Sequence, residues 1–249
     1  MKKNIINIKK KEGIKFAKFT GDNNGIHINE EVGNNSIYGE NIIHGVLIIL
    51  KTLEKIKFKK NYSYVKVSFE EGFKYKHDIA LQRLKFTKSK IFYNLIQQNS
   101  INAKIEIGIF PQSYQVNKLG KENLKKKYLV STKKTKELIF KSIPKDLVLA
   151  LSKLTKYVGT VYPGKNSLIS EVNISLTEKN QSDSVLINTD NSLVLKGFPV
   201  IINRLVYKNY TMQFKTLIRP QLKIKLSKPS NKILNEVNLT EKNVLIIGA

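Results

Sequence analysis

Two stretches of the chain repeat apolar residues at intervals of three and four, which is the spacing of one helix face. The first covers 41–57 and the second 142–158, about one hundred residues further on. Their apolar positions are Ile42, Val46, Ile49, Leu53 and Ile56 in the first, and Leu147, Leu151, Leu154 and Val158 in the second. Ser142 suits the N-cap of the second helix and Pro144 its first turn. The pattern therefore predicts two core helices.

After each helix, β-branched and aromatic residues alternate with polar ones, as in half-buried strands. The first strand of each half is expected at 63–69 and at 167–174. Further strands are expected at 78–87, 91–97 and 103–110 in the first half, and at 184–188, 193–195, 201–207 and 213–218 in the second. One helix followed by several antiparallel strands, occurring twice, predicts an α+β fold.

Polar segments divide the chain into units. The segment 112–127 joins the two halves, and 227–232 closes the second. We expect an N-terminal unit over 1–118, a second unit over 119–228 and a linker over 229–249. The last residues, 243–249 (NVLIIGA), resemble the first strand and first glycine of a Rossmann-type domain. The natural protein is therefore expected to continue into a short-chain reductase.

Composition narrows the class of protein. The chain has 249 residues, 41% of them hydrophobic and 25% charged, which is ordinary for a globular protein. The absence of cysteine excludes disulfides, thiolate metal sites and a thiol nucleophile. The N-terminus lacks the apolar core of a signal peptide, and the longest apolar run, 42–50, is about half the ~20 residues of a membrane span. We expect a cytoplasmic protein with no membrane segment.

A net charge of +25 predicts an anionic partner. The basic residues are almost all lysines spread along the chain, and lysine, isoleucine and asparagine are together what A/T-rich codons supply. A nucleic-acid arm would concentrate its charge and use arginine for phosphate contacts. Nucleic-acid binding is therefore the weaker alternative.

Candidate chemistry gathers in the sequence FAKFTGDNNGIH. Gly21 and Gly25 flank Asp22, Asn23 and Asn24, residue types that favour turns. An irregular loop is therefore expected over 22–27, presenting the carboxylate of Asp22 and the imidazole of His27. Such a pair can exchange protons or hold one water molecule. The same residues also suit a plain turn with a structural histidine, and spacing alone leaves both interpretations open.

The pattern Thr20-Gly21-Asp22-x-Asn24-x-Ile26-His27, followed by Tyr38-Gly39 and Ile43-His44-Gly45, closely resembles the motif of the MaoC-like dehydratases. These are the (R)-specific enoyl-thioester hydratase branch of the hotdog superfamily. The resemblance implies that Asp22 and His27 activate the catalytic water and that Asn24, with Gly21, orients the loop. It also implies that the backbone amide of Gly45, at a helix N-terminus, polarises the thioester carbonyl. Gly25 departs from the proline usual in the family, and His44 is expected to be structural.

The second half resembles the same family at 149–159 and at Tyr162-Pro163-Gly164-x-x-Ser167-Leu168, but it has no Asp/His loop. The resemblance implies a double hotdog: two long central helices, each wrapped by antiparallel sheet, with the N-terminal unit carrying the active-site loop. The two units would form a pseudo-dimer within one chain, with further homodimerisation left open. The second, degenerate unit would supply part of the acyl-binding wall.

The expected function is reversible addition of water to a trans-2-enoyl thioester, giving the (3R)-3-hydroxyacyl product. The substrate would be an acyl-CoA or an acyl carrier protein, whose phosphopantetheine belongs to the substrate, and no metal or redox cofactor is implied. Surface lysines would attract either carrier. A hotdog protein that binds acyl thioesters without turnover is the main alternative, and the Asp/His loop matches the hydratases better than the thioesterases.

Overall fold

The computed structural model describes most of the two predicted units. Its described residues are 4–58, 62, 64–87, 89–108, 126–128, 140–176, 185–190, 194–195 and 198–218. The closing segment 227–232, the terminal segment 243–249 and almost all of the joint at 112–127 lie outside them.

The described strands form one antiparallel sheet of eleven strands, in the order β1-β3-β4-β5-β2-β7-β11-β10-β8-β6, with β9 paired to β10. In the first half the strands are β1 (Ile5–Ile6), β2 (Tyr64–Phe69), β3 (Ile79–Phe86), β4 (Lys90–Gln97) and β5 (Ser100–Gly108). In the second half they are β6 (Lys126–Tyr128), β7 (Ser167–Leu176), β8 (Val185–Asp190), β9 (Val194–Leu195), β10 (Phe198–Tyr207) and β11 (Tyr210–Ile218). Every strand expected from the alternation matches one of these, and the α+β class is confirmed.

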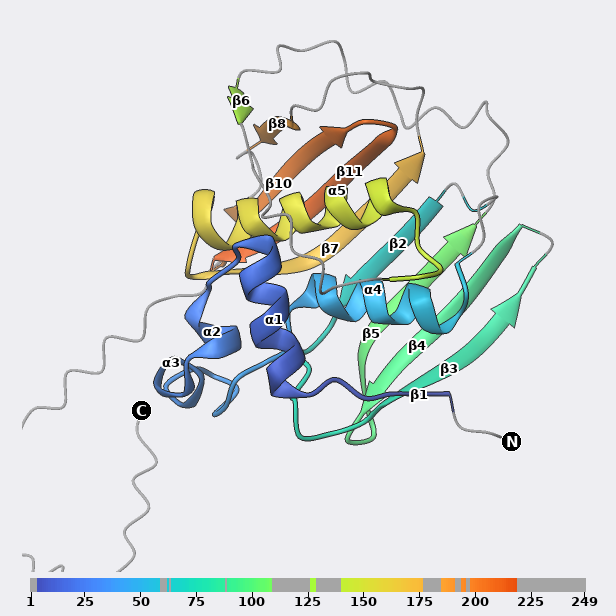
Figure 1. The fold of residues 1–249 in the computed structure, drawn as a ribbon, viewed down its shortest axis with the longest axis horizontal. Coiled ribbons are helices and arrows are strands. Elements are labelled where there is room, and N and C mark those ends of the chain that lie inside the picture. Colours follow the sequence, from blue (N-terminus) through green and yellow to red (C-terminus); the bar gives the residue numbers. More distant parts are fainter. Residues whose placement is uncertain are drawn as a thin grey trace, which may run out of the picture.

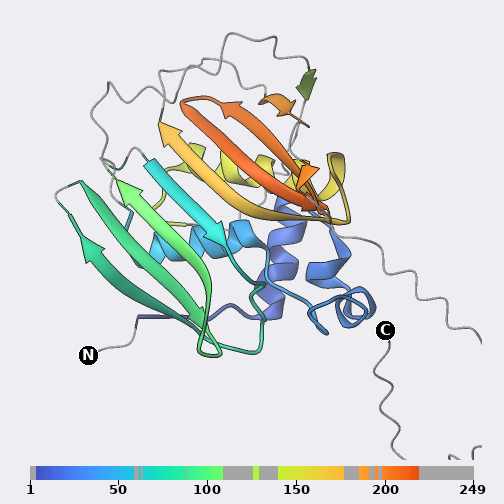
Figure 2. The ribbon, with the colours of Figure 1, turned by 180° about the vertical axis from the view of Figure 1, so that it is seen from behind.

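Two helices, α4 (Gly45–Lys55) and α5 (Lys145–Lys156), lie side by side on one face of the sheet (Figure 1). Seen from behind, the strands stand in front of both helices (Figure 2). The shorter helices α1 (Lys10–Thr20), α2 (Gly25–Ile28) and α3 (Glu30–Asn34) gather at one end of the α4–α5 pair. A π-helical turn, η1 (Tyr157–Val161), follows α5 directly. No helix among the described residues is long and apolar enough to cross a membrane.

The two halves share their sheet, which differs from the expectation that each helix is wrapped by its own. Strand β2 pairs with β7, placing Val67 opposite Val172 and Val65 opposite Ile174. All four side chains are buried. Because the edge strands satisfy each other's backbone groups and bury their apolar residues together, the two sheets merge into one instead of closing separately. The helices, at 11 and 12 residues, are also shorter than expected.

Both core helices begin later than the periodicity predicts. Ile42 forms a β-bridge with Lys74, and the Ile43 N–H donates to the Phe73 carbonyl, so this segment is extended up to α4. In the second helix, Pro144 occupies the N-cap position predicted for Ser142, whose hydroxyl instead donates to the Glu54 carbonyl. Tertiary hydrogen bonds take precedence over apolar spacing at both helix starts.

Candidate functional site

The segment that carries the Asp/His motif begins where α1 ends. The backbone of Gly21 adopts a left-handed conformation at φ +79°, and its N–H donates to the Ala17 carbonyl. That conformation suits glycine, so Gly21 can end the helix and turn the chain sharply. Thr20 Oγ1 then accepts the Asp22 N–H at 3.1 Å. The result places the side chain of Asp22, which is only 3% exposed, in the interior.

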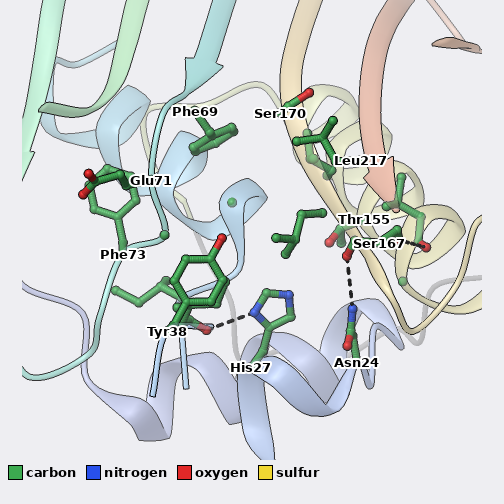
Figure 3. Close-up of a pocket in the computed structure, with 18 of the residues that line it drawn as sticks. Asn24, His27, Tyr38, Phe69, Glu71, Phe73, Thr155, Ser167, Ser170 and Leu217 are labelled. Carbon is green, nitrogen blue, oxygen red and sulfur yellow. Dashed lines mark hydrogen bonds between the residues drawn. The ribbon is translucent and has the colours of Figure 1, made fainter. Parts of the chain in front are cut away.

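Residues 22–27 are not the irregular loop that was expected, because α2 begins inside them. Asn24 is the N-cap of α2, and its Oδ1 accepts the Ile26 N–H at 3.4 Å. Its Nδ2 donates to the Ser167 carbonyl of β7 at 3.5 Å, the contact between the two halves drawn in Figure 3. The turn-forming asparagine is thus also a helix cap, and it fixes the direction in which α2 presents His27.

The ring of His27 is anchored through one nitrogen. Nδ1 lies 2.9 Å from the Ile42 carbonyl oxygen (Figure 3). A carbonyl oxygen only accepts, so Nδ1 carries the hydrogen, and in the neutral ring Nε2 carries the lone pair. The side chain is 7% exposed and lines the pocket described below. His27 is therefore arranged to accept a proton or a hydrogen bond through Nε2.

The carboxylate of Asp22 is held from both halves of the chain. Oδ2 accepts the Thr155 hydroxyl of α5 at 2.6 Å, and Oδ1 accepts the Asn24 N–H at 3.2 Å. Burial raises the pKa of Asp22, while the charge of His27 and the two hydrogen bonds oppose that rise. Gly159 of η1 packs against the same carboxylate so closely that a Cβ there would lie 2.0 Å from Oδ1. Asp22 is thus a buried carboxylate with a fixed orientation.

A pocket of about 110 Å³, far more than one water molecule needs, joins these groups. Residues of both halves line it. From the first half these include Asp22, Asn24 and His27 of the N-terminal segment and Gly45 at the start of α4. The lining from the second half comprises Thr155, Val158, Gly159, Ser167, Leu168, Ile169, Ser170 and Leu217. The first-turn N–H groups of α4 have no intrahelical acceptor and carry positive potential. An acid/base pair and a helix N-terminus therefore share one cavity.

Three potential metal ligands, Asp22, His27 and His44, have donor atoms within 4.8 Å of one another. The rings of His27 and His44 are stacked, with centroids 3.9 Å apart and an interplanar angle of 28°. A metal ion lies in the plane of each imidazole that binds it, at about 2.0–2.1 Å from the nitrogen. Two stacked rings cannot both meet that condition for one ion, so the cluster does not fit a metal centre in this arrangement.

Asp22, Asn24, His27 and Gly45, which the motif singles out, all line the same pocket. Thr155, Gly159 and Ser167 lie in second-half segments that resemble the same family, but the sequence did not predict their contacts with Asp22 and Asn24. Thr155 is 133 positions from Asp22 along the chain. No local spacing links residues that distant, and only the pairing of β2 with β7 and the packing of α5 bring them together.

The chain is similar to several solved structures. A MaoC-like dehydratase is 6% identical, and the match covers 88% of this chain and 97% of that chain with a TM-score of 0.55. A tesB protein of Mycobacterium avium subspecies paratuberculosis is 12% identical, with 72% and 88% covered and a TM-score of 0.44. The (R)-hydratase from A. caviae involved in PHA biosynthesis is 13% identical, with 43% and 91% covered and a TM-score of 0.37. No family model and no curated protein matches the chain.

The match to the dehydratase, over most of both chains, is a likeness of fold. Together with the helices on one face of an antiparallel sheet, it shows that this chain has the hotdog fold. The hotdog fold expected from the sequence is thereby confirmed at the level of the fold alone. The chemistry of this particular chain rests on its own residues.

Proposed function

We propose that this protein is an (R)-specific enoyl-thioester hydratase, interconverting trans-2-enoyl and (3R)-3-hydroxyacyl thioesters. The observation that carries the proposal is the pairing of a buried carboxylate, Asp22, with an imidazole, His27, in a pocket that also contains the N-terminus of α4. Hydration needs a held water molecule, a proton acceptor and a stabilised enolate oxygen. These residues can provide all three.

In the proposed reaction, a single water molecule donates one hydrogen bond to the carboxylate of Asp22 and a second hydrogen bond to Nε2 of His27. Both groups are acceptors when Asp22 is ionised and His27 is neutral. The water oxygen then forms a bond to C3 while one of the pair takes its proton. The electron pair of the C2–C3 double bond moves toward the carbonyl, and C2 receives a proton from the Asp22/His27 pair. Elimination of water is the reverse sequence.

The enolate oxygen would be stabilised at the start of α4. The amide of Gly45 is the first of the helix, and a side chain at this position would meet the ring of Phe69 at 3.1 Å. Glycine therefore allows a thioester carbonyl to approach the backbone closely. A donor of this kind contributes about 10²–10³ in kcat in enzymes with oxyanion sites.

For substrate and architecture we propose an acyl-CoA or acyl carrier protein as carrier, and a double hotdog with units at 1–118 and 119–228. In this arrangement the second unit supplies one wall of the acyl pocket and the hydroxyl that holds Asp22. The lysine-rich surface, at a net charge of +25, would attract either carrier. Continuation past 249 into a reductase remains a prediction from the sequence.

The test is loss of enoyl absorbance when the protein is mixed with crotonyl-CoA, a longer trans-2-enoyl-CoA, or the same acyl groups on a carrier protein. Asp22→Asn and His27→Ala are each expected to lower kcat/KM by about 100-fold or more. The chain offers matched controls: Asp78→Asn, at an exposed carboxylate bonded to Asn7, and His77→Ala, in the turn before β3. Both controls should keep full activity.

Two other results would each replace the proposal. Release of a free thiol without formation of the hydroxyacyl product would indicate a thioesterase. Binding of every enoyl thioester without any turnover would indicate the non-catalytic acyl-binding protein. Full activity in Asp22→Asn would exclude the assigned role of that carboxylate.

A further inference from the structure

His44 is a buried histidine that the proposed reaction does not use. It precedes α4, is 0% exposed and does not line the pocket, so it cannot touch a substrate there. Its ring lies between two others: it stacks on His27 at 3.9 Å and meets the edge of Phe16 at 5.2 Å. Phe16 is itself fully buried in α1. Packing in the core therefore keeps the imidazole of His44 stacked on the imidazole of His27.

The hydrogen bonding of His44 defines its tautomer. Nε2 lies 3.4 Å from the backbone carbonyl oxygen of Asp22, which can only accept, so Nε2 carries the hydrogen. Nδ1 is buried and has no hydrogen-bond partner among the described residues. Burial lowers the pKa of His44 well below its ordinary value of 6.5, and the charge of His27 lowers it further. Both effects favour the neutral form of the ring.

We propose that His44 is a positioning residue, which holds the plane of the His27 ring and the backbone of Asp22 in the arrangement that the pair needs. The hydrogen bond from His27 Nδ1 to the Ile42 carbonyl holds one edge of that ring. The stacked ring of His44 packs against its face and so limits tilting of the ring plane. The same side chain bonds to the carbonyl of Asp22, so one residue orients both members of the pair.

The electrical state of His44 matters as much as its shape. The groups facing it are His27 and the Asp22 backbone on one side and Phe16, which does not titrate, on the other. A charged His44 would oppose a proton on His27, whereas a neutral π-face favours one. Neutral His44 thus allows His27 to take up a proton during turnover. The importance of His44 for turnover rests on the proposed function. Its effect on the orientation of the His27 ring does not depend on that function.

The experiment uses the small number of histidines, since the chain has three: His27, His44 and His77. Histidine ring signals in the NMR spectrum of the whole chain are assigned with single variants and followed against pH. His44 is expected to stay neutral, in the Nε2–H tautomer, throughout the range in which the protein is folded. A wild-type His44 that titrates near 6.5 would overturn the proposal without any variant being needed.

Two substitutions separate the contributions of the ring and the hydrogen bond. His44→Gln keeps a donor near Nε2 and removes the stacked ring, whereas His44→Phe keeps a ring and removes the donor. His44→Gln is expected to shift the titration of His27 and to lower kcat/KM about 10- to 100-fold, mainly through kcat, as misplaced catalytic groups do. His44→Phe keeps a stacked ring, so its His27 titration should lie closer to that of the wild type than the His27 titration of His44→Gln does. His77→Gln is the matched control and should change neither.

If His44→Gln is folded and leaves both the His27 titration and the pH–rate profile unchanged, His44 is only a core residue and the proposal is wrong. If the wild type shows no hydratase activity but His44→Gln still alters the His27 signals, the positioning role holds and the proposed function alone fails. The NMR and kinetic measurements therefore separate the two proposals.

Discussion

At the scale of single residues, the burial of Asp22 has a measurable thermodynamic consequence. Because burial raises its pKa, the folded protein holds this proton more tightly than the unfolded chain does. The stability of the wild type must then fall as pH rises from the ordinary value of 3.8 through the higher pKa of the folded state. A variant with an uncharged side chain at position 22 should not lose this stability as pH rises.

Asp22→Asn is therefore expected to become more stable relative to the wild type as pH rises, although it removes the proposed activity. An amide can keep both contacts, with Oδ1 accepting the Asn24 N–H and Nδ2 donating to Thr155 Oγ1. Urea unfolding at about pH 4.5 and about pH 7.5 measures the difference on either side of the expected change. A wild type that gains stability relative to Asp22→Asn with rising pH would contradict the raised pKa.

The hydroxyl of Thr155 should control the protonation of Asp22. Its hydrogen bond to Oδ2 lowers the pKa of that carboxyl, so Thr155→Val is expected to raise it further. If the reaction needs ionised Asp22, the acidic limb of the kcat/KM profile moves to higher pH, and activity on that limb falls about tenfold for one lost charged hydrogen bond. Thr155→Ser keeps the hydroxyl and should keep the wild-type profile. Identical profiles for the Val and Ser variants would exclude a role for the hydroxyl.

At the scale of elements, the π-helical turn η1 brings Gly159 against Asp22, and a methyl group there would overlap the carboxylate. Gly159→Ala is expected to lower kcat/KM about 100-fold by displacing Asp22, at about 1–3 kcal/mol of stability. In an Asp22→Ala background the same substitution should destabilise the fold much less, because the carboxylate that the new methyl group would overlap is absent. Thr160→Ala, at the next and exposed position, is the control. An equal cost of Gly159→Ala in both backgrounds would show that the two residues are not in contact.

The elements also show where sequence patterns stop being informative. Alternation found the strands because each has one buried face, and apolar spacing found α4 and α5 because they lie against the sheet. Helix α1 was not predicted: it mixes four lysines and a glycine with the few residues it buries, such as Phe16 and Phe19. The sequence predicts a loop where α2 lies, because the asparagine that caps this helix also favours turns.

At the scale of the whole molecule, the candidate site belongs to neither half alone. The motif predicted Asp22, His27 and Gly45 from neighbouring residues, whereas Thr155 and Gly159 reach Asp22 only because the halves are joined through β2 and β7. A continuous sheet with a buried junction should make the two halves unfold together. Their cooperation can be tested at the junction itself.

Val67 and Val172 face each other across that junction and are both 0% exposed. Val67→Ala removes about two buried methylene equivalents and is expected to cost about 2 kcal/mol, including the cavity left behind. In urea, the ring signals of His77 report on the first half and the methyl of Met212, buried in β11, reports on the second. Both probes should lose native signal at one urea midpoint in the wild type, and at one lower urea midpoint in Val67→Ala.

Val161→Ala, at a 43% exposed valine, is the control and should leave the urea midpoint nearly unchanged. Two separate midpoints would mean that each half unfolds independently. The hydrogen bond from Thr155 to Asp22 would then be a contact between two docked domains and not part of one cooperative core.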